Sequence, residues 1–143
     1  MKISIGADHR GFALKQFLQK EIQDVSWIDV GAHDKNRSDY PLFAQAVSHA
    51  IASGQAAAGV LICGSGIGMA IAANRYKKMY AAVCLNEQMA RIAKEDEGAN
   101  ILVLPSDFVT NAQALAIFKV WQEATFKGGR YAQRLDLLDS MLP

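Results

Sequence analysis

Apolar residues gather along the chain in short runs that alternate with segments of mixed polarity. Runs of this kind, bounded by turn residues, predict strands at residues 2–7, 25–30, 57–63, 81–84 and 101–104. In the segments between and after them, apolar residues recur at a helical spacing. We expect helices there at residues 12–22, 39–54, 68–74, 86–95, 111–125 and 130–141.

This regular exchange of strand and helix is typical of an α/β fold built on a parallel sheet. The run at residues 57–63 is continuously apolar, as expected of a strand covered on both faces. We therefore expect a five-stranded parallel sheet with helices on both faces and an extra C-terminal helix. A length of 143 residues, with neither repeats nor a linker, fits one domain over residues 1–143.

Composition and charge narrow the functional classes. Fifteen Lys and Arg against 14 Asp and Glu leave a net charge of +1, which argues against a nucleic-acid or anionic-membrane partner. No apolar run reaches the roughly 20 residues of a membrane-spanning helix. The two cysteines form no disulfide framework, and the first residues, MKISIGADHRG, lack the features of a signal or transit peptide. We expect a cytoplasmic protein.

Ligands of parallel α/β folds bind beyond the carboxyl ends of the strands. The strongest signal at that edge is the loop 63–68, where Gly64, Gly66 and Gly68 let a ligand approach the backbone closely. If a helix starts there, its free N–H groups favour a phosphate or a developing oxyanion. A tight turn with packing glycines accounts for the same pattern equally well. The loop matches neither a dinucleotide-binding fingerprint nor a P-loop.

Two groups near this edge offer chemistry. Cys63 opens the loop, where its thiol could act as nucleophile or general base, although a small buried side chain is the plainer interpretation. Asp8, His9 and Arg10 follow the first expected strand. They can turn toward a shared cleft, or form a solvated turn in which Asp8 caps the next helix. Cys84 is interpreted as a core residue.

Arg130 and Arg134 lie four residues apart, and so on one face of the last expected helix. Two guanidinium groups placed together suit a phosphate dianion, but an exposed helix face is the simpler alternative. His33 and His49 lack ligand-like spacing from any Cys, Asp or Glu, so we expect no metal site.

Five segments form a recognisable series: residues 6–11 (GADHRG), 39–41 (DYP), 61–68 (LICGSGIG), 72–75 (AANR) and 128–130 (GGR). In their order, spacing and strand-end positions they resemble the type B ribose-5-phosphate isomerases, a family that includes the galactose-6-phosphate isomerase subunits. The resemblance runs nearly end to end. It implies a Rossmann-like domain that forms a homodimer or homotetramer, with active sites near the subunit interface. It also implies aldose–ketose isomerisation without metal or cofactor.

The resemblance further implies roles for individual residues. Cys63 is similar to the base that moves a proton between C1 and C2. Ser65 resembles a hydroxyl that assists at the sugar oxygens, and Asp8 a partner of the ring oxygen or of a hydroxyl. The amides of the loop resemble the anion hole for the enediolate, which implicates Gly64, Gly66, Ile67 and Gly68.

The remaining implied residues would bind the substrate. His9, Arg130 and Arg134 resemble the phosphate site of the family. Tyr40 resembles a substrate-contacting residue, and Asn100 is a further implied substrate contact.

Four positions depart from the family pattern. Asp96 and Glu97 stand where the ribose isomerases have the histidine linked with ring opening and its neighbouring asparagine. Asp107 replaces an arginine that is usual after the fifth strand, and Tyr131 replaces a histidine that is usual after Gly-Gly-Arg. The proton-transfer residues are thus retained, whereas residues for ring opening and phosphate binding differ.

We therefore expect an aldose–ketose isomerase that converts ribose 5-phosphate to ribulose 5-phosphate through a cofactor-free enediolate. An isomerase of another aldose phosphate, such as a galactose-6-phosphate isomerase-like subunit or a tetrose phosphate isomerase, is the first alternative. A non-catalytic sugar-phosphate-binding protein is the second, because of the replaced histidine. A receiver-type signalling domain shares the alternation, but it needs an Asp and a Lys where this chain has Cys63 and Pro105.

Overall fold

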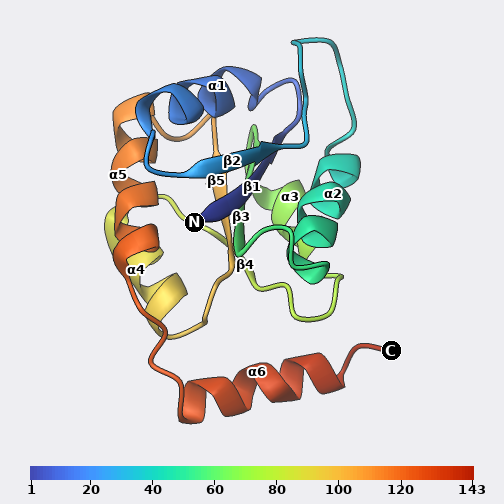
Figure 1. The fold of residues 1–143 in the computed structure, drawn as a ribbon, viewed down its shortest axis with the longest axis vertical. Coiled ribbons are helices and arrows are strands. Elements are labelled where there is room, and N and C mark those ends of the chain that lie inside the picture. Colours follow the sequence, from blue (N-terminus) through green and yellow to red (C-terminus); the bar gives the residue numbers. More distant parts are fainter.

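The computed structural model describes residues 1–143 as a sheet of five strands flanked by helices (Figure 1). The strands are β1 (Lys2–Ala7), β2 (Ser26–Asp29), β3 (Ala58–Cys63), β4 (Ala81–Val83) and β5 (Ile101–Pro105). The helices are α1 (Phe12–Glu21), α2 (Tyr40–Ala52), α3 (Ile67–Ala73), α4 (Glu87–Glu95), α5 (Asn111–Glu123) and α6 (Arg130–Ser140). Every expected element is present, with ends that differ by at most two residues.

All paired strands run parallel, in the order β2-β1-β3-β5-β4. The central strand β3 explains why helices cover both faces of this sheet. All six of its residues are buried, and they alternate between two hydrophobic clusters. Val60 and Ile62 pack with α1, α4 and α5, whereas Leu61 and Cys63 pack with α2 and α3. The expected α/β class is therefore confirmed, and the thiol of Cys63 faces the layer of α2 and α3.

The carboxyl ends of three neighbouring strands meet at one edge of the sheet. Ala7 at the end of β1 pairs with Ile62 of β3, and Cys63 pairs with Pro105 at the end of β5. Because the strands are parallel, the loops that follow them emerge side by side at this edge. These are the loops to which the sequence analysis assigned chemistry.

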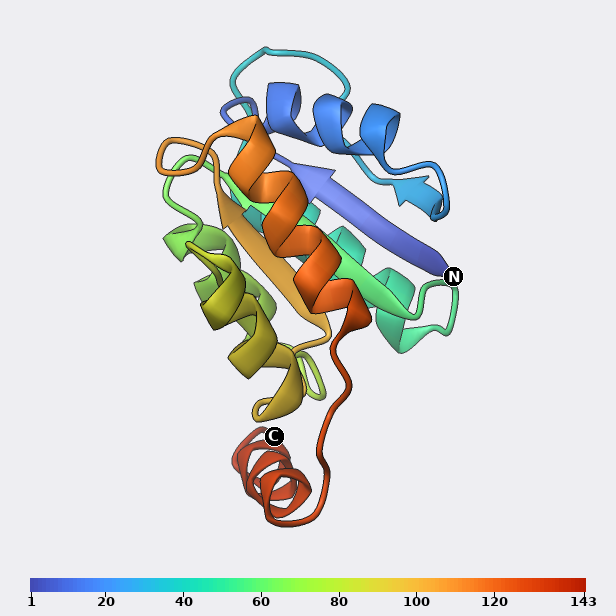
Figure 2. The same cartoon turned by 90° about the vertical axis from the view of Figure 1, so that its left-hand side faces the viewer.

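The C-terminal helix α6 lies beyond the opposite edge of the sheet, set apart from the two helix layers (Figures 1 and 2). It is anchored there by Asp139, whose Oδ2 accepts a hydrogen bond of 2.7 Å from the hydroxyl of Tyr80, the residue before β4. Leu135 is the one buried residue of this helix. The longest helices, α2 and α5, have 13 residues, and no helix combines the length and apolarity needed to cross a membrane.

A buried ion pair joins α1 to β2. The side chain of Lys15 is 1% exposed, and its Nζ lies 2.6 Å from Oδ1 of Asp29. Burial alone would raise the pKa of Asp29, but hydrogen bonds from Lys15, Gly31 and Gln19 outweigh it and hold that pKa below its usual value. The ionised form of Asp29 is thus favoured by folding, and it contributes stability above the ordinary carboxyl pKa.

The Lys15→Ala variant is expected to lower the free energy of unfolding by about 3 kcal/mol, because it strips a partly buried carboxylate of its cation. The exposed Lys20 on the same helix is the matched control, and Lys20→Ala should change stability by no more than about 0.5 kcal/mol. Denaturant unfolding measures both. The difference between wild type and Lys15→Ala should shrink as the pH falls below about 4, where Asp29 becomes protonated. A pH-independent difference would contradict this account.

Candidate active site

Hydrogen bonds join the loops at the carboxyl edge into one surface. The backbone N–H groups of Ser106 and Asp107 donate to the carbonyls of Cys63 and Gly64, both at 2.9 Å. The hydroxyl of Ser106 also donates to the carbonyl of Arg10, at 3.1 Å. The loops after β1, β3 and β5 are therefore held in fixed register around the end of β3.

The loop after β3 is shaped by its glycines. Gly66 has a φ of +73°, a left-handed conformation that side chains rarely adopt, and it precedes the first residue of α3. A β-carbon at Gly68 would lie 2.7 Å from two carbons of the Tyr40 ring, so only glycine lets this ring approach so closely. The hydroxyl of Ser65 accepts a hydrogen bond of 3.2 Å from the N–H of Ile67. The expected turn is thus present, and the close approach at Gly68 is made by the Tyr40 ring, as expected of a packing glycine.

The two cysteines occupy different surroundings. Cys63 is 5% exposed and ends its strand at the glycine loop. Cys84 is 1% exposed and lies within the main hydrophobic cluster. Burial raises the pKa of the Cys84 thiol to about 12, so this thiol stays protonated. The interpretation of Cys84 as a core residue is confirmed.

Asp8 and His9 are both fixed by the backbone. Asp8 is 6% exposed, and its Oδ1 accepts hydrogen bonds from the N–H groups of Arg10 and Gly11, at 3.0 and 3.1 Å. Asp8 therefore stabilises the buried turn before α1, rather than capping the helix, whose N-cap is Gly11 without a side-chain hydrogen bond. No protein group donates to Oδ2 of Asp8. Oδ2 is the oxygen left for a ligand.

His9 is held by a pair of hydrogen bonds to Ser38. Its backbone N–H donates to the Ser38 hydroxyl at 3.2 Å, and its Nδ1 accepts from the Ser38 N–H at 3.3 Å. With Nδ1 occupied as an acceptor, the neutral imidazole carries its proton on Nε2. His9 can thus donate a hydrogen bond to an anionic group through Nε2.

The structure brings most of the implied site residues together at the carboxyl edge. They are Asp8, His9, Tyr40, Cys63, Gly64, Ser65, Gly66, Ile67 and Gly68. The first two come from the loop after β1, Tyr40 from the first turn of α2, and the others from the loop after β3 and the start of α3.

The structure does not bring the other three residues to this edge within one chain. Asn100 precedes β5 and therefore lies at the amino edge, where its side chain bridges the N–H of Tyr80 and the carbonyl of Lys78, at 2.9 and 2.8 Å. Arg130 and Arg134 belong to α6, beyond that same edge (Figure 1).

The two α6 arginines nevertheless form a cluster of their own. Their guanidinium carbons lie 5.2 and 5.5 Å from the centroid of the Tyr131 ring, which both of them contact. Asp96, at the end of α4, is paired with Lys127 at 2.8 Å. The candidate residues of one chain are therefore divided between the two edges of the sheet.

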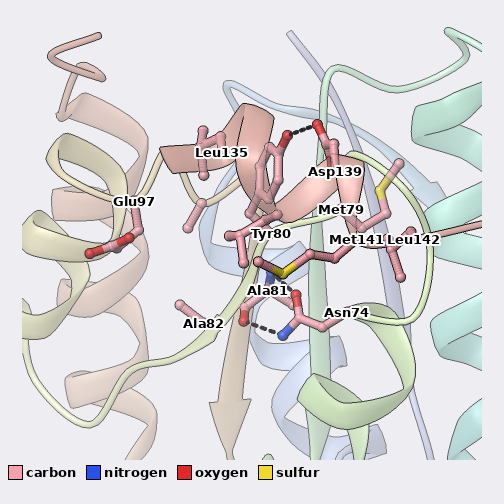
Figure 3. Close-up of a pocket in the computed structure, with 12 residues that line it drawn as sticks. Asn74, Met79, Tyr80, Ala81, Ala82, Glu97, Leu135, Asp139, Met141 and Leu142 are labelled. Atoms are coloured by element: carbon pink, nitrogen blue, oxygen red, sulfur yellow. Dashed lines mark hydrogen bonds between the residues drawn. The ribbon is translucent and has the colours of Figure 1, made fainter. Parts of the chain in front are cut away.

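A cavity of about 480 Å³ lies between α6 and β4 (Figure 3). Its lining is mostly apolar, and its charged side chains are the carboxylates of Glu97 and Asp139. Burial raises the pKa of Tyr80 in this cavity to about 12, together with its hydrogen bond to Asp139 and the charge of that group. A cavity without a cation does not suit a sugar phosphate, so it is not the candidate active site.

The structure adds two side chains that the sequence analysis left without a role at this edge. Ser38 orients His9 from the loop before α2, and Asp107 forms an ion pair of 2.6 Å with Arg10. Asp107 lies just after the carboxyl end of β5, where a charged residue indicates a candidate site residue. The residues around Ser38 are polar and show no sequence pattern from which its hydrogen bonds with His9 could be predicted.

Comparison with known proteins decides the family. The model of the ribose/galactose isomerase family matches residues 3–138. The chain belongs to this family. Ribose-5-phosphate isomerase B of Escherichia coli (strain K12) is 35% identical over 142 residues, which cover 98% of this chain and 95% of that protein. A putative sugar phosphate isomerase of Rickettsia bellii is 39% identical over 93% of this chain and 94% of its own length.

Solved structures of the family agree with the fold. Ribose-5-phosphate isomerase B of Clostridium thermocellum superposes with a TM-score of 0.94 at 42% identity, over 99% of this chain and 97% of that chain. The Mycoplasma genitalium enzyme, solved with bound ribulose 5-phosphate, superposes with a TM-score of 0.92 at 33% identity, over 98% and 95% of the two chains. The family resemblance inferred from the motifs is confirmed, and it is a family of aldose–ketose isomerases.

Proposed function

We propose that the protein isomerises ribose 5-phosphate to ribulose 5-phosphate with its own side chains and without a cofactor. One observation carries the proposal. Cys63 is the last residue of β3 and places a thiol beside the glycine loop, and the chain is similar along nearly its whole length to an isomerase solved with ribulose 5-phosphate. The phosphorylated substrate favours a cytoplasmic location.

In the proposed mechanism Cys63 acts as a thiolate base. It removes the proton from C2 of the open-chain aldose, and the electron pair forms the C1–C2 double bond of an enediolate. The same thiol then returns the proton to C1 as the carbonyl forms at C2. Backbone N–H groups of the loop 64–68 stabilise the charge on oxygen, and the Ser65 hydroxyl assists proton movement between the two oxygens.

Binding residues hold the reacting carbons against this base. Asp8 accepts a hydrogen bond from a sugar hydroxyl or assists at the ring oxygen through Oδ2, and Tyr40 contacts the sugar beside Gly68. His9 donates to the phosphate through Nε2. Fixed contacts of this kind convert the proton transfer into a reaction between prepositioned groups.

A second copy of the chain completes the site in this proposal. Arg130 and Arg134 are paired on Tyr131 but lie at the edge opposite Cys63, so they suit the phosphate bound by another copy. The helix that carries them and the residue that follows it also expose apolar side chains: Leu137 is 61% exposed, Leu138 51% and Met141 75%. Burial of these side chains against a partner favours a homodimer, or a homotetramer built from dimers.

Another aldose phosphate is the second candidate substrate, and Asp96 is the observation that favours it. The carboxylate of Asp96 is paired with Lys127, where the ribose isomerases have a histidine linked with ring opening. A carboxylate paired in this way is a different acid–base group from an imidazole, and it suits a different sugar ring.

Ketose formation from ribose 5-phosphate, galactose 6-phosphate and a tetrose 4-phosphate tests the proposal. We expect the highest kcat/KM with ribose 5-phosphate, because the proton-transfer residues of the ribose isomerases are retained. Turnover of galactose 6-phosphate or the tetrose phosphate alone would replace ribose by the second candidate. Binding of a sugar phosphate without turnover of any would contradict the assignment of an enzyme.

A further inference from the structure

An ion pair lies directly against the backbone of the glycine loop. Nη2 of Arg10 and Oδ2 of Asp107 are 2.6 Å apart. A β-carbon at Gly64 would lie 2.8 Å from Oδ2 of Asp107 and 2.9 Å from Nε of Arg10. The two side chains remain 59% and 42% exposed. Their charged groups thus sit at the loop surface, within reach of both the backbone and an incoming ligand.

Hydrogen bonds between the loops that follow β1, β3 and β5 fix the position of this pair. The Ser106 hydroxyl donates to the carbonyl of Arg10, and the N–H of Asp107 donates to the carbonyl of Gly64. An arginine side chain at a surface normally samples many rotamers. Here its backbone is anchored and its guanidinium is bonded to Asp107, so the cation is held beside the loop.

The pair and the thiol occupy opposite sides of the loop. Cys63 packs with α2 and α3, whereas the next residue, Gly64, directs its β-carbon position toward Arg10 and Asp107. Those two residues stand in the loops that lead into α1 and α5, on the other face of the sheet. The ion pair therefore borders the same loop as Cys63, so a sugar phosphate whose reacting carbons lie at Cys63 can extend past Gly64 toward it, with its phosphate at the far end.

We propose that Arg10 is a phosphate-binding residue of this site and that Asp107 competes with the phosphate for it. This inference rests on the proposed function. A guanidinium has five N–H donors, and Asp107 occupies only part of them. The remaining donors can bind a phosphate oxygen, while the carboxylate of Asp107 repels the dianion. Position 107 thus sets how strongly the site holds the phosphorylated end of its substrate.

Inorganic phosphate is the probe, and calorimetry measures its binding to wild type, D107N and the double variant R10Q/D107N. We expect D107N to bind phosphate about threefold more tightly than wild type, because one negative charge is removed from a partly exposed position. In the D107N background, R10Q should weaken phosphate binding about tenfold, the effect of losing a charge-assisted hydrogen bond. R91Q, which removes an exposed arginine from α4, is the matched control and should change phosphate binding little.

The outcomes separate this inference from the proposed function, because phosphate binding is measured without turnover. Equal phosphate affinity in D107N and R10Q/D107N would overturn the role of Arg10. Weaker binding in D107N than in wild type would overturn the competition by Asp107. If ribose 5-phosphate is turned over, R10Q in the D107N background should raise KM about tenfold with little change in kcat. Thermal unfolding confirms that each variant is folded.

Discussion

Replacement of Cys63 by alanine is expected to lower kcat for ribose 5-phosphate about a thousandfold or more, because the variant lacks the base that the proposed mechanism uses to move the proton between C1 and C2. The serine variant should be nearly as inactive, since a hydroxyl is a far weaker base than a thiolate unless a neighbour activates it. Both substitutions are small and fall at the end of β3, so the fold should be retained. Steady-state kinetics and thermal unfolding measure the two effects separately.

Cys84 provides the matched control for this experiment. It is the only other cysteine, and its thiol is buried and protonated within the main hydrophobic cluster. Cys84→Ala should lose some stability and keep kcat within a few-fold of wild type. A Cys63→Ala variant that kept a tenth of wild-type turnover would remove Cys63 from the mechanism.

The elements of the fold could be predicted because each strand is a short apolar run with clear boundaries. The run 57–63 is the clearest case, since its residues 58–63 form β3, where complete burial on both faces leaves no polar position. The place of the site followed from the same information, because parallel strands must end at one edge. The glycine loop was therefore located from sequence, and Gly66 has the left-handed backbone of a tight turn. The close contact at Gly68 is made by the Tyr40 ring, which is the packing role that the sequence left open.

Long-range partners at the site could not be predicted in the same way. The bond between His9 and Ser38 spans 29 residues, and the hydrogen bond between Ser106 and Arg10 spans 96. Neither residue pair forms a periodic pattern, and their contact depends on how the loops fold over the sheet edge. The Arg10–Asp107 ion pair is of the same kind: two charges at strand ends were visible, but their pairing was not.

The division of the candidate residues between two edges was also hidden in the sequence. Asn100 directly precedes β5 and Cys63 is the last residue of β3. Because these two strands are parallel neighbours, the two residues lie at opposite ends of them, about one strand length apart. The direction of α6 is set by a turn at Gly128 and Gly129, where φ is +68° and +56°. The sequence predicts a helix on each side of this turn, but it gives no information about where the second helix lies.

Complementation between two inactive variants is expected if a second copy of the chain completes the site. One variant is Cys63→Ala, and the other replaces both Arg130 and Arg134 by alanine. The second should lose about a hundredfold or more in kcat/KM, because two guanidinium contacts to phosphate are removed. Each variant alone should therefore be nearly inactive.

A mixture of the two variants, dissociated and allowed to reassociate, should regain roughly a quarter of wild-type activity, because half of the dimers formed at random are hybrids and each hybrid has one intact site of its two. In that site the arginine variant supplies Cys63 and its partner supplies Arg130 and Arg134. The matched control mixes Cys63→Ala with a chain that carries all three substitutions, in which no Cys63 remains, and it should stay inactive. Failure of the first mixture to recover activity would show that α6 does not serve the site of another copy. Full activity of the arginine variant by itself would show that the phosphate is bound without it, and would leave Arg10 and His9 as the phosphate-binding residues of a site contained within one chain.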